Sequence, residues 1–156
     1  MIISDLIANT QAILPLVALK AWACLLLLVD LFITKERKVW TAFLAAVGLL
    51  ISMVILAVRL LDGTAALPGE VFSGMLSVDL YGFFLCLLFQ ASGLVAIAIA
   101  HDYLKRMRIE RGEFYVLLLF SIGGMMMMSF AADLIIVFLA LEWLSVPLYV
   151  LAGFAR

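Results

Sequence analysis

The sequence predicts an all-α polytopic membrane protein with five transmembrane helices. Of its 156 residues, 68% are hydrophobic and only 13% are charged, whereas a soluble domain is about half apolar and about a quarter charged. The apolar residues gather in five runs, each of roughly the length that crosses a bilayer as a helix. A soluble fold of this size could not bury so much apolar surface, so we expect residues 1–156 to form a single transmembrane helical domain.

Each apolar run predicts one helix. The runs cover residues 13–33, 40–61, 80–100, 114–130 and 134–154. Four of them have 21 or 22 residues, and at a rise of about 1.5 Å per residue each spans about 30 Å, the hydrocarbon thickness of a bilayer. The run 114–130 has 17 residues, which is the short end of the spanning range. Lipid offers no partners to backbone groups, so every spanning segment must be helical.

The charges between the runs predict an orientation. Eight of the ten basic residues lie in three places that share one side if the chain threads back and forth: residues 34–38, residues 105–111 and Arg156. The other side carries mainly acidic residues, namely Asp5, Asp62, Glu70, Asp79 and Asp133. Basic residues are enriched in cytoplasmic loops, so the pattern predicts an N-terminus outside the membrane and a C-terminus in the cytoplasm.

The links between the runs predict how some helices pack. Residues 131–133 are a very short link, so the last two helices must form an antiparallel pair. Asp133 stands where its carboxylate would cap the following helix. The pair Gly123 and Gly124 would let another helix approach closely. The link 62–78 is rich in glycine and contains a proline, which argues against a helix running through it.

Glu142 is the candidate functional residue, because it lies inside the last apolar run. A charged carboxylate at membrane depth costs at least about 2.5–3.5 kcal/mol, and such residues usually serve a function. Ser145 and Tyr149 follow at the i+3 and i+7 positions of the same helical face, which predicts a polar stripe suited to a proton relay or a hydrated cavity. Pro147 has no N–H, so we expect a kink and a free carbonyl at Trp143. The alternative is a proline that serves packing only, beside a protonated and inactive Glu142.

Lys20 and His101 are two further residues that could carry charge inside or beside the runs. Lys20 is the only other charged residue well inside a run; it could pair with an acid, but we favour a side chain that snorkels to the outer face, because its depth is only about 10 Å. A fixed cationic partner for Glu142 is then expected outside this chain. His101 ends the run 80–100, and we interpret it as a solvated histidine at the membrane rim rather than a site of proton exchange.

Other polar residues inside or beside the runs predict structural contacts only. We expect Gln90 to form hydrogen bonds with a neighbouring helix and Asp30 to meet Lys35. Cys24 and Cys86 lack metal-site spacing and are interpreted as small buried hydrophobic residues.

Several kinds of chemistry have no motif in this sequence. It contains no phosphate-binding loop, no Cys or His cluster for zinc or iron–sulfur and no glycine fingerprint for a dinucleotide. We therefore expect no cofactor in this chain and no oxidation of NADH or hydrolysis of ATP by it alone. The net charge of −1 gives no reason to expect nucleic acid as a partner.

Four stretches carry a resemblance to a known family: Ser77–Phe84 (SVDLYGFF), Arg111–Phe120 (RGEFYVLLLF), Ala131–Leu134 (AADL) and Leu141–Phe154 (LEWLSVPLYVLAGF). They resemble the antiporter-like subunit N of NADH–quinone oxidoreductase, the bacterial respiratory complex I. The related subunits M and L and the multisubunit sodium/proton antiporters share the glutamate, but the EFY entry and the LE-x-LS-x-PLYVL-x-GF pattern favour subunit N. The resemblance is strong from about Leu76 onward and rests on hydropathy before that.

The resemblance implies a proton-translocating subunit of the inner (plasma) membrane of a bacterium. Its partners would be the other antiporter-like and small membrane subunits of complex I and the lipid bilayer. Quinone, NADH, FMN and iron–sulfur clusters would be bound by partner subunits. Glu142 matches the family's glutamate of helix five, which works against a lysine of helix seven.

The sequence departs from this family in length. The family chain has about fourteen helices, and this sequence matches only the first five. The lysine partners are missing, so we expect either a fragment or truncation, or a subunit split between chains, and no complete proton path in this chain alone. Two alternatives remain: a subunit of a multisubunit sodium/proton antiporter, and a structural membrane protein whose helices pack on partners.

Overall fold

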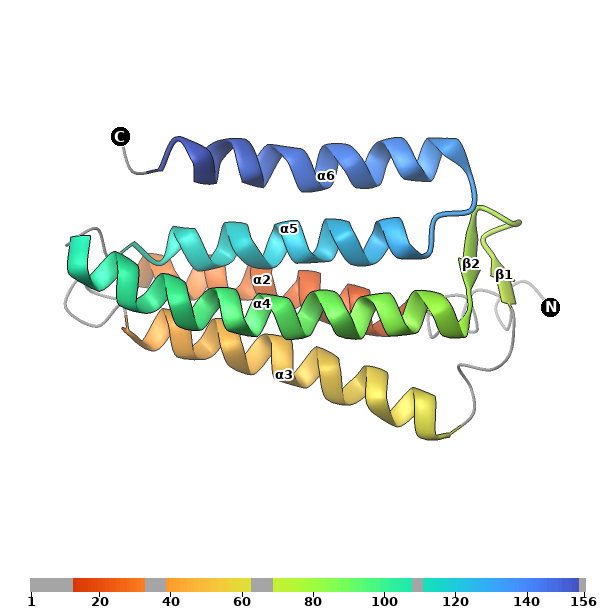
Figure 1. Cartoon of the computed structure of the whole chain (residues 1–156), viewed down its shortest axis with the longest axis horizontal. Helices are drawn as coiled ribbons and strands as arrows, with labels where there is room; N and C mark the ends of the chain where they lie inside the picture. The colour runs from red at the N-terminus through yellow and green to blue at the C-terminus, as the bar shows by residue number, and fades with distance from the viewer. Residues whose placement is uncertain (1–12, 33–38, 63–68, 108–110, 155–156) are drawn as a thin grey trace.

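A computed structural model describes residues 13–32, 39–62, 69–107 and 111–154 (Figure 1). The described elements are the helices α2 (Leu14–Phe32), α3 (Val39–Leu61), α4 (Leu80–Met107), α5 (Glu113–Ser129) and α6 (Leu134–Ala152), with the strands β1 (Gly69–Val71) and β2 (Leu76–Val78). Within these residues, four helices are long and apolar enough to cross a membrane, namely α2, α3 from Trp40 onward, α4 and α6. Helix α5 is a shorter apolar helix of 17 residues. The chain is therefore an all-α multi-pass membrane protein, as the sequence predicts.

Helix α5 is the centre of the bundle, because it contacts α2, α3, α4 and α6. Figure 1 shows α6 along one edge, beside α5, and α3 along the opposite edge. The core consists mainly of fully buried aliphatic and aromatic side chains, such as Leu19, Leu49, Phe83, Leu119 and Met126. Helix α6 buries only Ala140 and Pro147, so most of its surface is left for lipid or for other protein.

The packing of α6 on α5 depends on small side chains. A Cβ atom at Gly124 would lie 2.8 Å from the backbone nitrogen of Leu144, which is closer than real Cβ contacts allow, so only glycine permits this approach. Asp133 caps the start of helix α6, and its Oδ1 accepts a hydrogen bond of 3.1 Å from the Ile135 amide. The close approach at the glycine pair, the aspartate cap and the antiparallel pair are thus confirmed.

The link between α3 and α4 contains a hairpin that the sequence analysis did not predict. Strand β1 pairs antiparallel with β2, in the register Gly69 to Val78. The turn between them has positive φ angles at Phe72, Ser73 and Gly74. The glycines and the proline of this link excluded a helix but gave no strand pattern, since each strand has only three residues.

The hairpin is joined to the turn between α5 and α6. The Ser77 amide donates to the Phe130 carbonyl at 2.9 Å, and the Ala132 amide donates to the Met75 carbonyl at 3.0 Å. This connection satisfies backbone groups of the short α5–α6 turn. The hairpin therefore helps to fix where α6 begins.

A buried polar network links four helices near the middle of the bundle. The Gln90 Nε2 atom donates to Ser52 Oγ at 2.9 Å and to Met126 Sδ at 3.4 Å. Ser52 Oγ in turn donates to the Pro15 carbonyl at 2.9 Å. The predicted role of Gln90 is confirmed. Within the described part of the chain, its Oε1 atom is buried without a hydrogen-bond partner.

Asp30 joins three helices at the opposite end of the bundle from the hairpin. Its Oδ1 accepts a hydrogen bond of 2.8 Å from Thr41 Oγ1, and its carboxylate packs against Gly112, where α5 starts. A negative charge suits the positive end of the helix dipole there. The expected partner Lys35 lies outside the described residues.

Two predictions are wrong: the end of the run 80–100 as a helix end, and the burial of Cys24. Helix α4 continues past residue 100 to Met107, because a drop in hydropathy marks the membrane surface and not the end of a helix. His101 is therefore inside the helix, half-buried, with its Nδ1 atom 3.5 Å from Tyr115 Oη. Cys24 is exposed on α2, whereas Cys86 is buried as expected.

We predict that Gly124→Ala destabilises the chain by about 1–3 kcal/mol, the usual cost of overpacking, because the new methyl group would meet the backbone of Leu144. The measurement is the midpoint temperature of unfolding in membranes or detergent. Gly153→Ala is the matched control, since a Cβ atom there would be in ordinary contact at 3.8 Å. Equal midpoints for the two variants would contradict the close approach.

Candidate functional site

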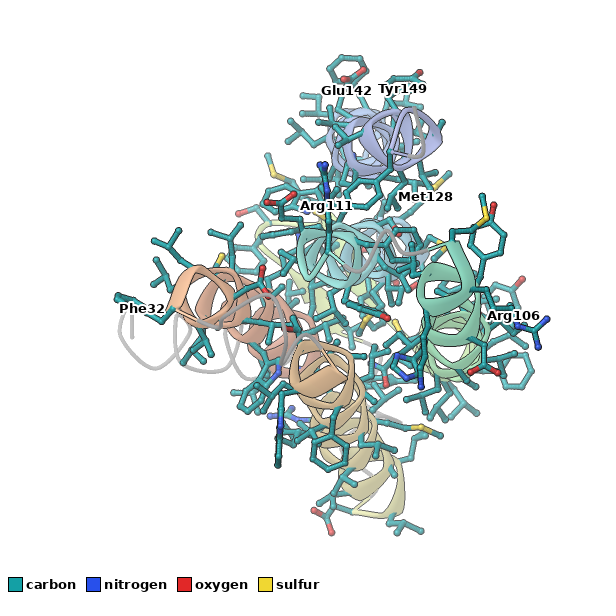
Figure 2. All side chains as sticks on the ribbon, turned by 90° about the vertical axis from the view of Figure 1, so that its left-hand side faces the viewer. Phe32, Arg106, Arg111, Met128, Glu142 and Tyr149 are labelled. Atoms are coloured by element: carbon teal, nitrogen blue, oxygen red, sulfur yellow. The ribbon has the colours of Figure 1, made fainter. Side chains whose placement is uncertain are left out.

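Glu142 lies on the outer face of α6. It is the ninth residue of a helix that begins at Leu134, which places it about 12 Å along the helix axis. Its side chain is exposed, and Figure 2 shows it on the side of α6 that faces away from the other helices. The structure thus places a carboxyl group at membrane depth on the surface of the five-helix bundle.

Tyr149 shares this face with Glu142. The side chain of Tyr149 is 75% exposed, and both residues are at the outer edge of α6 in Figure 2. They are seven residues apart, so they lie about 10 Å from each other along the axis. No hydrogen bond joins the two side chains in the described part of the chain, and a connection would need an intervening water or a side chain from elsewhere.

Ser145 is bonded to its own helix. Its Oγ atom donates to the Leu141 carbonyl at 2.6 Å, four residues earlier. The hydroxyl proton is therefore used within the helix, and only the oxygen lone pairs are left to accept a hydrogen bond. Ser145 is half-buried, so it lies at the flank of the outer face rather than at its centre.

Pro147 is buried against α5 while α6 continues through it to Ala152. The proline thus packs in the helix interface, which fits the alternative in which Pro147 serves packing. The kink and the free carbonyl at Trp143 stay predictions.

Lys20 does not snorkel, and that prediction is wrong. Its Nζ atom lies 3.6 Å from the centroid of the Trp143 ring and 3.7 Å from Met127 Sδ. The stem of the side chain crosses α5 at Gly123, where a Cβ atom would lie 3.2 Å from Lys20 Cε. Lys20 therefore reaches from α2 across α5 to the residue next to Glu142. Gly123 and Trp143 were visible in the sequence, but only the packing of three helices brings them to Lys20.

Among the described residues, no group of three or more His, Cys, Asp or Glu side chains is placed to hold a metal ion. One apolar cavity of about 590 Å³ lies between α3 and α4. It is lined by Leu60, Leu80, Tyr81, Phe84 and Leu87. None of these residues belongs to α6, so the cavity is separate from the face that carries Glu142.

Comparison with known proteins identifies relatives over most of this chain, although no family model matches it. NADH-quinone oxidoreductase subunit N 2 of Roseiflexus castenholzii is 48% identical over 135 residues, or 86% of this chain. Subunit N of Chloroflexus aggregans is 38% identical over 153 residues, or 94% of the chain. Subunit N 1 of Herpetosiphon aurantiacus is 37% identical over 137 residues, or 88% of the chain.

The resemblance to subunit N is confirmed. The chain spans 26% of the length of the Roseiflexus and Herpetosiphon subunit N proteins and 29% of the Chloroflexus subunit N. The similarity therefore covers a part of these proteins. It extends over nearly all of this chain, including the early residues that the sequence analysis matched by hydropathy alone.

We predict that a membrane-permeant carbodiimide labels Glu142 when the chain is held in membranes without other proteins, because the side chain is exposed on α6. Labelling is measured by peptide mass spectrometry, with Glu142→Gln as the negative control. Glu113, exposed at the start of α5, serves as the internal reference for a carboxyl group that water reaches. Glu142 that stays unlabelled while Glu113 reacts would contradict the outward orientation.

Proposed function

We propose that this chain is part of a proton-translocating membrane subunit of a respiratory NADH–quinone oxidoreductase, in which Glu142 is the proton carrier. Two findings support the proposal. The curated relatives are named as subunit N of that enzyme, and the position of Glu142 on α6 requires a polar neighbour from outside the described bundle.

The outward position of Glu142 is the observation that carries the proposal. A charged group left against hydrocarbon costs about 2.5–3.5 kcal/mol or more, and intramembrane acids accordingly face protein or water. Glu142 faces neither within the described helices, since it lies on the outer side of α6 (Figure 2). We infer that further protein covers this face and supplies a partner for the carboxylate, which the family resemblance implies to be a lysine.

The chemistry of the α6 face follows from its three polar groups. A Glu142 Oε atom takes a proton from a water or from a cationic partner, becomes neutral, and later returns it. A nearby cation favours the charged carboxylate and a dry surrounding favours the neutral acid, so movement of the partner charge would drive uptake and release. Tyr149 Oη can donate and accept, and Ser145 Oγ can accept, so both are suited to hold waters on the route.

The described charges support the proposed orientation. Lys105 and Arg106, in the last turn of α4, and Arg111, before α5, lie at one end of the bundle. Asp79 and Asp133, which directly precede α4 and α6, lie at the other end (Figure 1). By the positive-inside rule, we propose that the basic end is cytoplasmic, with the N-terminus outside, the C-terminus inside, and α5 as a fifth span of a bacterial inner membrane.

We propose that NADH, FMN, the iron–sulfur clusters and quinone bind to partner subunits, and that the partners of this chain are other membrane subunits of the same complex. The relatives' names favour this assignment over the sodium/proton antiporter. Purification of the native chain with its associated subunits separates the two, because redox subunits either accompany it or do not. A purely structural subunit would tolerate loss of the Glu142 carboxyl group.

We predict that Glu142→Gln, introduced into the complete complex, removes most coupled proton pumping while the complex assembles normally. Glu142→Asp keeps the acid and should retain more activity. Pumping is measured as proton uptake into vesicles driven by NADH, with assembly measured in parallel. The control is Glu113→Gln, which removes an exposed carboxylate at the end of α5. Normal pumping by Glu142→Gln at normal assembly would defeat the proposal.

A further inference from the structure

The contact between Lys20 and Trp143 is unusual for a charged group at membrane depth. Lys20 is the seventh residue of α2 and Trp143 the tenth of α6, so they lie about 9 Å and about 14 Å from the starts of their helices. Among the described residues, the contacts of the Lys20 ammonium are the Trp143 ring at 3.6 Å and the Met127 thioether at 3.7 Å. These are contacts to a π face and to a soft sulfur atom.

The closest part of the α5–α6 interface is made of small residues. Helix α6 contributes Ala140 and Pro147 as its buried residues, and α5 contributes Gly124 at the closest approach. Small side chains allow close packing, but they offer few knobs that resist rotation of one helix against the other. Larger side chains resist rotation at two places. Phe154, just after α6, meets Phe114 at 5.6 Å between ring centroids, and Trp143, within α6, contacts Phe120 at 6.3 Å between centroids and the Lys20 ammonium.

Trp143 is the residue directly after Glu142, and neighbouring residues of a helix point about 100° apart. When the Trp143 ring is held toward α2 and α5, Glu142 must point to the outer face. A rotation of α6 that released Trp143 would turn Glu142 toward the flank of the bundle. The direction of the carboxyl group is thus tied to the position of one ring.

We propose that Lys20 is a positioning residue for Glu142: its ammonium, laid across α5 at Gly123, holds the face of Trp143 and so sets the rotation of α6. Electrostatic attraction between a cation and the negative face of an indole ring supplies the force. Gly123 leaves room for the Lys20 side chain to cross α5, because a larger side chain there would press on the methylene groups of the lysine. The role of the contact in proton transfer rests on the proposed function, whereas the contact itself does not.

Stepwise fluorination of Trp143 tests the contact, because each fluorine weakens the negative face of the ring with little change in size. Fluorinated tryptophans are introduced at position 143 of the full chain in its native complex. We expect the unfolding midpoint of the chain to fall with each added fluorine when Lys20 is present. Contacts of this type shift an equilibrium about 2-fold to 30-fold, which is the total loss expected over the series.

Two matched series show whether the effect comes from the Lys20 charge. In Lys20→Met the fluorine dependence should vanish, and in Lys20→Arg it should persist, because a guanidinium also binds an aromatic face. The same fluorination at Trp40, an exposed ring with an edge contact to Phe43, is the control. Because no cation of the described residues lies over this ring, its fluorine dependence should be the same with Lys20 and with Lys20→Met. The proposed contact would be wrong if the unfolding midpoint fell equally with each fluorine in the Lys20 and Lys20→Met chains, or if it did not change with fluorination of Trp143.

Proton pumping of the same complexes tests the positioning role. At normal assembly, we expect the pumping rate to fall with each fluorine added to Trp143. We also expect it to fall in Lys20→Met and to be higher in Lys20→Arg than in Lys20→Met. A graded midpoint with constant pumping would overturn the positioning role and leave a packing contact. Normal pumping by Glu142→Gln would instead defeat the proposed function, and the midpoint series would still decide whether Lys20 holds Trp143.

Discussion

Hydrocarbon offers no hydrogen-bond partners, and this constraint explains most of the structure. Every polar side chain on a spanning helix must find its partner in protein or in water. The Gln90 Nε2 atom and the Ser52 hydroxyl do so through a chain of bonds that ends at the Pro15 carbonyl, and Asp30 does so through Thr41 and the start of α5. These contacts lie between the four helices α2 to α5, where the core of the bundle is also found.

Helix α6 differs from the other four because its polar groups are not used to hold the bundle. Ser145 is bonded to its own backbone, while Glu142 and Tyr149 point away from the other helices (Figure 2). The inner face of α6 packs closely on α5 at Gly124, and the outer face carries a carboxyl group and a phenol group. The polar side chains of α2 to α5 thus hold these helices together, whereas two polar side chains of α6 lie on its exposed face.

The sequence predicted those features that depend on local chemistry. Hydropathy located the helices, the aspartate before Leu134 predicted a cap, and the glycine pair predicted a close approach, because each depends on residues adjacent in the chain. Lys20 shows the limit of this reasoning. Depth along one helix suggested that it snorkels, but the ammonium has inward partners on two other helices, and their registers relative to α2 are set only by packing. The β1–β2 hairpin was missed for a similar reason, since its strands are stabilised by pairing with each other and with the α5–α6 turn.

The Glu142 site shows the same limit from the opposite direction. The spacing of Glu142, Ser145 and Tyr149 correctly placed Glu142 and Tyr149 on one face, because helical periodicity is a local property. Which way that face points depends on how α6 is rotated on α5, and this is settled by Gly124, Trp143 and the lysine of another helix. The outward direction of the Glu142 carboxyl group therefore follows from contacts that its neighbours make with α5 and α2. Helical periodicity alone could not predict this direction, because the contacts join residues that are far apart in the sequence.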